Sequence, residues 1–382
     1  MSFRLCFPKI NISGAGALAE VPLELAQRGF STPLVVTDAV LVKAGLVRPL
    51  LDGLKAKGLS PVLFDGVLPN PTVGIVDQAF DAFTRGKCDS IVAVGGGSPI
   101  DTGKAVRILS ANPKPVTLYN GVGKVAREGA FLIAVNTTAG TAAEVTSNAV
   151  ITDTDNQVKM VIISPNIIPD ISVNDPAMMT GIPAPITAAT GMDALTHAIE
   201  AYVAKGAHVL TDHSALEAIR LITAYLPRAV DNGADLEARE MMAYGQFIAG
   251  LAFNSAGLGM VHAMAHQPGA VKNLPHGVCN AILLPAVESV NRPHAKRRFA
   301  DIARAMGVDT AGMDDEAASQ AAIAAIRALS ARVGIPKGFA ELGVTEADLP
   351  VFVRKAQQDP CAPGNPVAMT DEQVMAIYRE TL

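Results

Sequence analysis

The sequence predicts two successive domains: an α/β domain with a parallel β-sheet in residues 1–181, and an all-helical domain in residues 182–382. In the first half, short apolar runs rich in Val and Ile alternate with helical patterns, whereas the second half contains helical patterns only. The change falls at GIPAPIT (181–187), where two prolines precede a long helical pattern. A chain of 382 residues is also long for a single hydrophobic core.

The apolar runs of the first half predict strands that are buried on both faces. They are PLVVTD (33–38), SPVLFDG (60–66), SIVAVGGG (90–97) and FLIAVNTT (131–138). Helical segments such as LVRPLLDGLKAKG (46–58) and TVGIVDQAFDAFTRG (72–86) lie between them, so the strands are expected to pair in parallel through right-handed crossovers. A later segment, AVITDTDNQVKMVIIS (149–164), predicts a hairpin that turns at Asp155-Asn156.

The helical patterns of the second half place apolar residues at intervals of three and four. They cover residues 187–202, 210–230, 238–253, 294–308 and 318–334.

Composition excludes several classes of protein. The chain is 49% hydrophobic and 18% charged, which excludes a disordered protein, and its net charge of −5 comes without a basic block, which argues against nucleic-acid binding. No apolar run reaches the length of about 18 residues that a membrane span needs. The four cysteines form no CxxC pair and predict no disulfide framework. A cytoplasmic protein without a membrane or nucleic-acid partner is expected.

A glycine-rich loop predicts a phosphate site. SIVAVGGGSPIDTGKAVRIL runs from a strand through Gly95–Ser98 into a helix, whose free N–H groups and partial positive charge favour a pyrophosphate. The loop is not the GxGxxG fingerprint, and such a turn can be purely structural.

Two neighbouring segments strengthen this interpretation, because they also follow strands. Asn136–Thr141 offers hydroxyl and N–H groups, and Asp38 ends PLVVTD. A carboxylate there accepts hydrogen bonds from an adenosine ribose and repels a 2′-phosphate, which favours NAD over NADP. Alternatively, Asp38 caps the next helix.

Histidines and an aspartate in the second half have the spacing of a metal site. Asp193 and His197 are four residues apart, so on a helix they project from one face. His262 and His266 repeat this spacing, and His276 follows in a Pro-His-Gly turn. Three imidazoles and one carboxylate suit ferrous iron or zinc. A single His in an apolar helix is commonly a core residue, but this combination favours a metal site.

Seven stretches together resemble the iron-dependent (group III) alcohol dehydrogenases, close to the lactaldehyde reductase/propanediol oxidoreductase branch and the bacterial iron alcohol dehydrogenases. They are DGVLPNPT, VGGGSPIDTGKA, NTTAGTAAEVT, SVNDP, TAATGMDALTHAIEAY, VHAMAHQPG and LPHGVCNAILLP. The resemblance covers nearly the whole chain. It implies an NAD-binding α/β domain, a helical iron-binding domain and a homodimer.

The resemblance also implies roles for individual residues. The metal ligands would be Asp193, His197, His262 and His276, with His266 nearby. The residues bordering the dinucleotide would be Asp38, Asn70, Gly96, Gly97, Ser98, Thr137, Thr138, Thr141, Asn148 and Lys159.

The expected reaction is reversible oxidation of a small primary alcohol or diol to the aldehyde, with NAD accepting the hydride. A divalent ion favours loss of the hydroxyl proton, and His266 is expected to relay that proton. Relatives usually have Leu-Gly where this chain has Pro268-Gly269, so the helix carrying His266 is expected to end or kink there.

Other activities stay open at this point. Glycerol dehydrogenase and dehydroquinate synthase resemble this fold, bind NAD and generally use zinc. A metal-dependent hydrolase would lack NAD binding, and a metal- or nucleotide-sensing protein would lack turnover. The physiological alcohol, and iron against zinc, are not fixed by the sequence.

Overall fold

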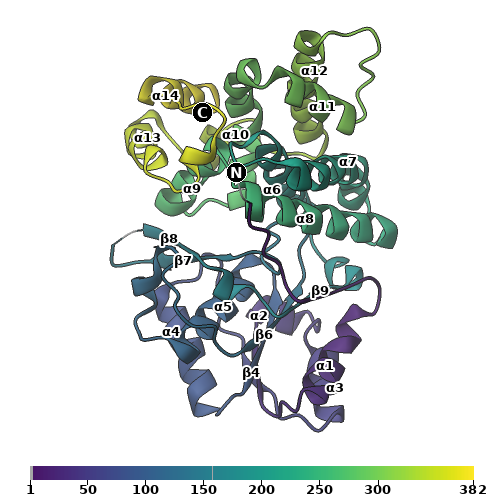
Figure 1. Ribbon diagram of the computed structural model, residues 1–382, viewed down its shortest axis with the longest axis vertical. Coiled ribbons are helices and arrows are strands. Elements are labelled where there is room, and N and C mark those ends of the chain that lie inside the picture. The colour runs from purple at the N-terminus through teal and green to yellow at the C-terminus, as the bar shows by residue number, and fades with distance from the viewer. Residues whose placement is uncertain (1–2, 157) are drawn as a thin grey trace. The chain divides into compact units, whose positions relative to one another are not determined.

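The computed structural model describes residues 3–156 and 158–382, which form two compact units (Figure 1). One unit comprises Cys6–Thr138 and Ala142–Met179. The other comprises Thr180–Leu382, residues 3–5, and the short segment Ala139–Thr141. The main division at Thr180 lies beside the boundary that the prolines of GIPAPIT predict, whereas the two short segments that join the helical unit carry no signal in the sequence.

The first unit is built on a six-stranded sheet whose strands all pair in parallel. In spatial order the strands are β1 (Ile10–Ser13), β9 (Ile171–Asn174), β6 (Phe131–Asn136), β4 (Ser90–Gly95), β2 (Pro33–Val36) and β3 (Val62–Phe64). The predicted α/β class and the four predicted strands are confirmed. Strands β1 and β9, which pair with each other at one side of the sheet, were not predicted.

Helices cover both faces of this sheet. Helices α1 (Glu20–Gln27) and α3 (Arg48–Ala56) pack on the face that carries Val92 and Val94. Helices α4 (Val73–Arg85) and α5 (Gly97–Ala111) pack on the face that carries Ile91 and Ala93. Successive residues of β4 therefore enter opposite cores, which is why its sequence is a continuous apolar run.

A second, three-stranded sheet contains the predicted hairpin. Strand β7 (Asn148–Asp153) pairs antiparallel with β8 (Val158–Ile163), and β5 (Gly121–Val122) adds to β8 in parallel. The hairpin prediction is confirmed. The short helix α2 (Ala39–Lys43) follows β2.

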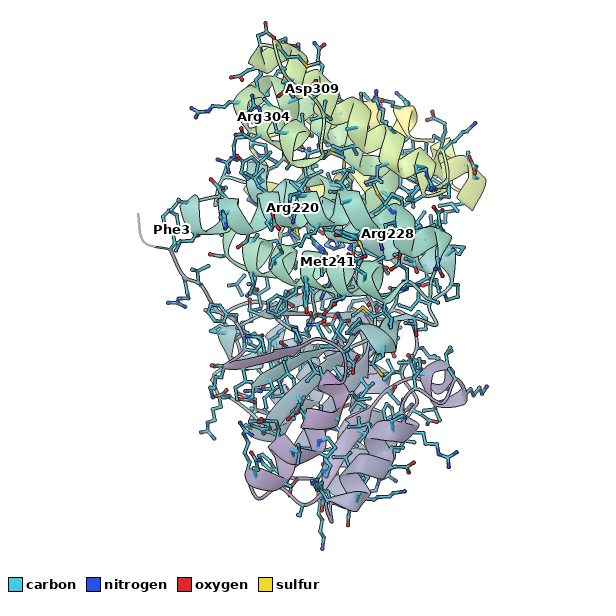
Figure 2. All side chains as sticks on the ribbon, turned by 90° about the vertical axis from the view of Figure 1, so that its right-hand side faces the viewer. Phe3, Arg220, Arg228, Met241, Arg304 and Asp309 are labelled. Atoms are coloured by element: carbon cyan, nitrogen blue, oxygen red, sulfur yellow. The ribbon has the colours of Figure 1, made fainter. Side chains whose placement is uncertain are left out.

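The second unit consists of helices, as predicted. They are α6 (Ala184–Val203), α7 (Val209–Asp231), α8 (Leu236–Ala256), α9 (Met260–Lys272), α10 (His276–Asn291), α11 (Lys296–Ala305), α12 (Asp315–Arg332), α13 (Leu349–Gln357) and α14 (Asp371–Glu380). Helices α6, α7 and α8 pack against one another. Arg220 and Arg228 on α7 and Met241 on α8 mark this layer in Figure 2. Arg228 pairs with Asp235 and Glu237 across the α7–α8 connection.

Of the two outcomes predicted at Pro268, an end or a kink, the structure excludes the end: α9 continues to Lys272. A proline has no N–H for the carbonyl four residues earlier, which here belongs to Met264. The buried hydroxyl of Tyr378, on α14, donates to that carbonyl oxygen at 2.8 Å. The backbone group that the proline leaves unpaired is thereby satisfied, and the helix is kept.

Among the described residues, no single helix is long and apolar enough to cross a membrane. Helices α8 and α9 pass the same test as a pair, but they meet at an angle of 105°.

Candidate metal centre and phosphate loops

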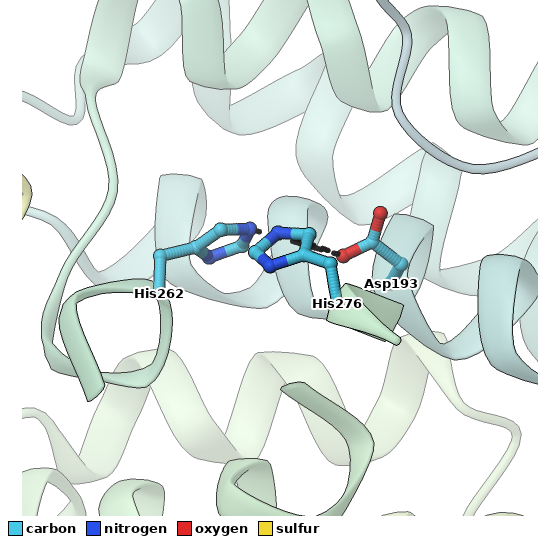
Figure 3. A group of neighbouring side chains, drawn as sticks. All are labelled: Asp193, His262 and His276. Carbon is cyan, nitrogen blue, oxygen red and sulfur yellow. Dashed lines mark ion pairs between the residues drawn. The ribbon is translucent and has the colours of Figure 1, made fainter. Parts of the chain in front are cut away.

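Three of the predicted metal ligands converge in the helical unit (Figure 3). Asp193 lies on α6, His262 on α9 and His276 at the start of α10, and one donor atom from each lies within 4.8 Å of the others. Asp193 Oδ1 is 3.9 Å from His262 Nε2 and 3.6 Å from His276 Nε2. His276 was predicted in a turn but is the first residue of α10, and Pro275 occupies the N-cap position.

Exposure differs among the three ligands. The side chains of Asp193 and His262 are 3% and 2% exposed, whereas that of His276 is 29% exposed. A small molecule would therefore approach the cluster from the side of His276.

The side-chain amide of Asn280 lies among the three donor atoms. Its Nδ2 donates to Asp193 Oδ1 at 2.6 Å and lies 3.2 Å from His262 Nε2 and 3.1 Å from His276 Nε2. Three potential ligand atoms thus surround one NH2 group, which has only two hydrogens to donate to them, so the arrangement is suited to a positive centre. The Oδ1 of Asn280 is buried without a hydrogen-bond partner.

His197, the fourth predicted ligand, lies beside this cluster but outside the group of three. Its ring stacks on His262 with centroids 4.5 Å apart and on Phe253 with centroids 4.3 Å apart. Its Nδ1 is buried without a hydrogen-bond partner. A buried, unpaired ring nitrogen costs free energy, which a bound cation would offset.

Burial keeps two of these histidines neutral. Desolvation lowers the pKa of both His197 and His262 to about 4, although the charge of Asp193 opposes the shift. At pH 7 both rings therefore hold a free lone pair, as a metal ligand must. Neutral imidazoles and one carboxylate fit iron or zinc.

The second nitrogen of His262 contacts a buried carboxylate. Nδ1 lies 2.5 Å from Glu200 Oε2, and Glu200 Oε1 accepts from the backbone N–H of Val261 at 2.7 Å. Burial raises the pKa of Glu200 to about 7, while hydrogen bonds from Val261 and Gly259 lower it.

The Nδ1 of His266 contacts a different carboxylate, that of Asp359. Its Nδ1 lies 2.8 Å from Asp359 Oδ2, and together with Cys361 these residues form a second cluster with donor atoms within 4.8 Å. Its ring stacks on His276 with centroids 5.2 Å apart. Burial and the Asp359 charge hold the pKa of the Cys361 thiol well above its usual range, which disfavours the thiolate that a metal needs.

The glycine-rich loop of the α/β unit runs beside the segment after β6. Gly95 pairs with Asn136 in register, and Thr137 N donates to Gly95 O at 3.0 Å. A Cβ on Gly96 would lie 3.0 Å from the hydroxyl oxygen of Thr138. Gly97 begins α5, and because the N-cap is glycine, no side chain caps that helix. Gly96, Gly97 and Ser98 therefore lie at a helix N-terminus that no side chain caps, which suits a phosphate. The backbone N–H groups of Thr137 and Thr138 in the adjoining segment are bonded to Gly95 O and Asn136 Oδ1.

Two of the remaining predicted cofactor residues, Asp38 and Asn70, accept hydrogen bonds within the α/β unit. Asp38 caps α2, since its Oδ1 accepts from Val40 N and Leu41 N, both at 2.9 Å. Asn70 Oδ1 accepts from Lys159 Nζ at 2.8 Å.

The structure also shows the surroundings of two further predicted residues, Asn148 and Thr141. The carbonyl of Asn148 accepts from the buried Lys104 Nζ at 2.7 Å. Thr141 belongs to the helical unit, where the neighbouring Gly140 approaches Thr190 so closely that a Cβ would lie 2.7 Å away.

The sequence analysis did not single out Glu200, Asn280, Asp359 or Lys104. Two of them carried a usable signal. Glu200 is seven residues after Asp193 and Asn280 four after His276, so each lies on the same helix face as a predicted ligand.

Comparison with known proteins gives matches over almost the whole chain. Residues 8–176 match the profile of iron-containing alcohol dehydrogenases, and residues 187–382 match the C-terminal profile of the Fe-containing alcohol dehydrogenase family. The 1,3-propanediol dehydrogenase of Citrobacter freundii is 45% identical over 385 residues, covering 100% of both chains. The NAD-dependent methanol dehydrogenase of Bacillus methanolicus is 43% identical over 375 residues, covering 98% of each. A crystal structure of a 1,3-propanediol oxidoreductase matches with a TM-score of 0.98 at 44% identity, covering 100% of both chains.

Proposed function

The chain belongs to the iron-containing alcohol dehydrogenase family, as its motifs predict, and we propose that it reversibly oxidises a small primary alcohol or diol with NAD. The observation that carries this proposal is the convergence of Asp193, His262 and His276 within 4.8 Å, beside the unpaired ring nitrogen of His197. NAD is favoured because the similar methanol dehydrogenase is NAD-dependent.

Asp193, His197, His262 and His276 are the residues that would hold the metal. When bound, ferrous iron or zinc acts as a Lewis acid that favours loss of the substrate's hydroxyl proton and, in the reverse direction, polarises the carbonyl. The exposed edge of His276 leaves room for a small alcohol, whereas buried His262 and Asp193 exclude water from the far side.

His266 is proposed to relay the proton. Its Nδ1 is engaged by Asp359, which leaves Nε2 for proton exchange. Its partly exposed ring, stacked on His276, provides a path between the cluster and solvent.

In the α/β unit, the pyrophosphate of NAD would be held by backbone N–H groups of Gly96–Ser98 and by the hydroxyl groups of Thr137 and Thr138. The other residues proposed to border the dinucleotide are Asp38, Asn70, Thr141, Asn148 and Lys159. Asp38 would face the ribose, where its charge disfavours a 2′-phosphate.

The cap that Asp38 provides allows its two roles to be separated. Asp38→Asn retains a good helix cap but loses the charge, and Asp38→Gly loses both. If charge selects NAD, both variants accept NADP more readily than the parent does. Unchanged preference in Asp38→Asn would refute the ribose role.

The experiment that tests the proposed function is NADH formation across a panel of short alcohols and diols. Metal-stripped protein is assayed before and after addition of ferrous iron or zinc. Turnover that returns with the metal supports the proposal. Absence of turnover with every alcohol, in protein that binds NAD, would refute it and favour the synthase-like activity.

We further propose a homodimer and a cytoplasmic location. The homodimer rests on family resemblance, and light scattering of the purified protein tests it. The cytoplasmic location rests on composition, and cell fractionation tests it.

A further inference from the structure

Glu200 occupies a pocket that is built around its carboxylate. It lies on α6, seven residues after Asp193, and is 1% exposed. Oε1 accepts from Val261 N at 2.7 Å, and Oε2 lies 2.5 Å from His262 Nδ1. One carboxylate therefore contacts both the backbone at the start of α9 and the side chain of a proposed metal ligand.

The backbone leaves room for this carboxylate only because residue 259 is glycine. A Cβ on Gly259 would lie 3.0 Å from Glu200 Oε1 and 2.7 Å from Asn365 Oδ1. Asn365 Oδ1 in turn accepts from Met260 N at 3.0 Å. Two buried side chains from other segments thus cap the first N–H groups of α9, which fixes the helix that carries His262.

The opposite edge of the His262 ring indicates its tautomer. Asn280 Nδ2 donates to the Asp193 carboxylate at 2.6 Å, which sets the orientation of the amide. That same NH2 group lies 3.2 Å from His262 Nε2. The NH2 group has one hydrogen beyond the one given to Asp193, and His276 Nε2 at 3.1 Å competes with His262 Nε2 for it. The ring proton is assigned to Nδ1 from the Glu200 side as well, because a carboxylate 2.5 Å from that nitrogen can only accept.

We propose that Glu200 is a positioning residue that holds His262 as its Nδ1–H tautomer and thereby directs the Nε2 lone pair to the metal. This inference rests on the proposed function, because it takes His262 as a ligand. A carboxylate behind a ligating histidine fixes the ring and raises its basicity, and loss of such a partner typically weakens metal binding about 10–100-fold.

The variant that isolates this role is Glu200→Gln. Its amide oxygen can still accept from Val261 N, but its NH2 group donates to His262 Nδ1 and so favours the wrong tautomer. The matched control is Glu288→Gln, because Glu288 is also fully buried but bonds Asn291 rather than a ligand.

The test is the dissociation constant for Zn²⁺, measured by competition with a chelator in protein stripped of metal. We expect Glu200→Gln to bind zinc about 10–100-fold more weakly than the parent, and Glu288→Gln to stay within about twofold. Equal losses in both variants would show a merely structural effect and overturn the proposal. Unchanged affinity in Glu200→Gln would also overturn it.

A measurement on the unmodified protein covers the case in which Glu200→Gln does not fold. Long-range ¹H–¹⁵N NMR of the metal-free protein at pH 8 reports which ring nitrogen of His262 carries the proton. Protonation at Nδ1 is expected, and protonation at Nε2 would overturn the inference. Failure of the parent to bind zinc would instead overturn the ligand assignment of the proposed function, so the two failures are distinguishable.

Discussion

The metal centre of the helical unit and the phosphate loops of the α/β unit are assembled in opposite ways. In the metal centre, the functional atoms belong to side chains on buried helices, and two of these side chains are each contacted by another buried side chain. Asn280 bonds Asp193, and Glu200 contacts His262. The local helical backbone there is ordinary.

In the phosphate loops, the functional atoms belong to the backbone and are available because side chains are missing. Gly95 has φ +155°, and a Cβ there would lie 2.4 Å from Pro99 Cγ. Gly96 approaches Thr138 in the same way. Removal of a side chain should therefore damage the metal centre, whereas addition of one should damage the loops.

The largest expected effect follows from removal of a metal ligand. His276→Ala should lower metal affinity by more than about 100-fold, because loss of a ligand exceeds loss of its supporting partner. Metal content and NADH formation should fall together. His294→Ala, which removes an exposed histidine, is the matched control. Full metal content with normal turnover in His276→Ala would contradict the assignment of His276 as a metal ligand.

A buried carboxylate should make the stability of the helical unit depend on pH. Burial raises the pKa of Glu288 to about 8 from the ordinary 4.5, with the charge of Glu200 adding to the shift. The folded state then holds a proton that the unfolded state releases, so this group's contribution is present below pH 4.5 and is lost as pH rises toward 8.

The check compares the free energy of unfolding of metal-free parent and Glu288→Gln at pH 5 and pH 8. The parent should lose stability relative to the variant, by on the order of 2 kcal/mol over this interval. A difference between the two proteins that does not change with pH would show that Glu288 is ionised in the folded state.

Adding one carbon to the phosphate loop should weaken NAD binding without changing metal binding. In Gly96→Ala the new Cβ meets Thr138 at 3.0 Å and displaces the adjoining loop. We expect the KM for NAD to rise about tenfold, equivalent to about 1.4 kcal/mol. Metal content should stay unchanged. Gly181→Ala is the control, because a Cβ there meets nothing within 4 Å. Loss of metal from Gly96→Ala would contradict the separation of the two sites.

The smallest expected effect concerns the second half of α9. Tyr378→Phe removes the hydroxyl that donates to Met264 O, the carbonyl left unpaired by Pro268. The free energy of unfolding should fall by about 1 kcal/mol. Tyr225→Phe, at a partly exposed ring, should change it little. Equal stability of the parent and Tyr378→Phe would show that Met264 O has another partner.

The comparison also explains what the sequence could predict. Strands buried on both faces and helices with regular apolar spacing carry strong patterns, so the parallel sheet and the helical unit were predictable. The i, i+4 spacing of Asp193 and His197 likewise indicated a metal site. Loop functions were less clear: Asp38 fits a helix cap and a ribose contact equally well in sequence, and the structure shows the cap.

The remaining features depend on residues distant in the chain. Glu200 and His262 are 62 residues apart, and Tyr378 is 114 residues from Met264. Neither pairing follows from local periodicity. The sequence left open whether α9 ends or kinks at Pro268 for the same reason, because the compensating hydroxyl lies on another helix.

Anomalous diffraction at the iron absorption edge, from crystals of the iron-loaded protein, tests the proposed metal ligands most directly. One peak per chain is expected, about 2.0–2.2 Å from an Asp193 oxygen and from one ring nitrogen each of His197, His262 and His276. A peak instead at the cluster of His266, Asp359 and Cys361, or no peak in protein that turns over alcohol, would contradict this assignment.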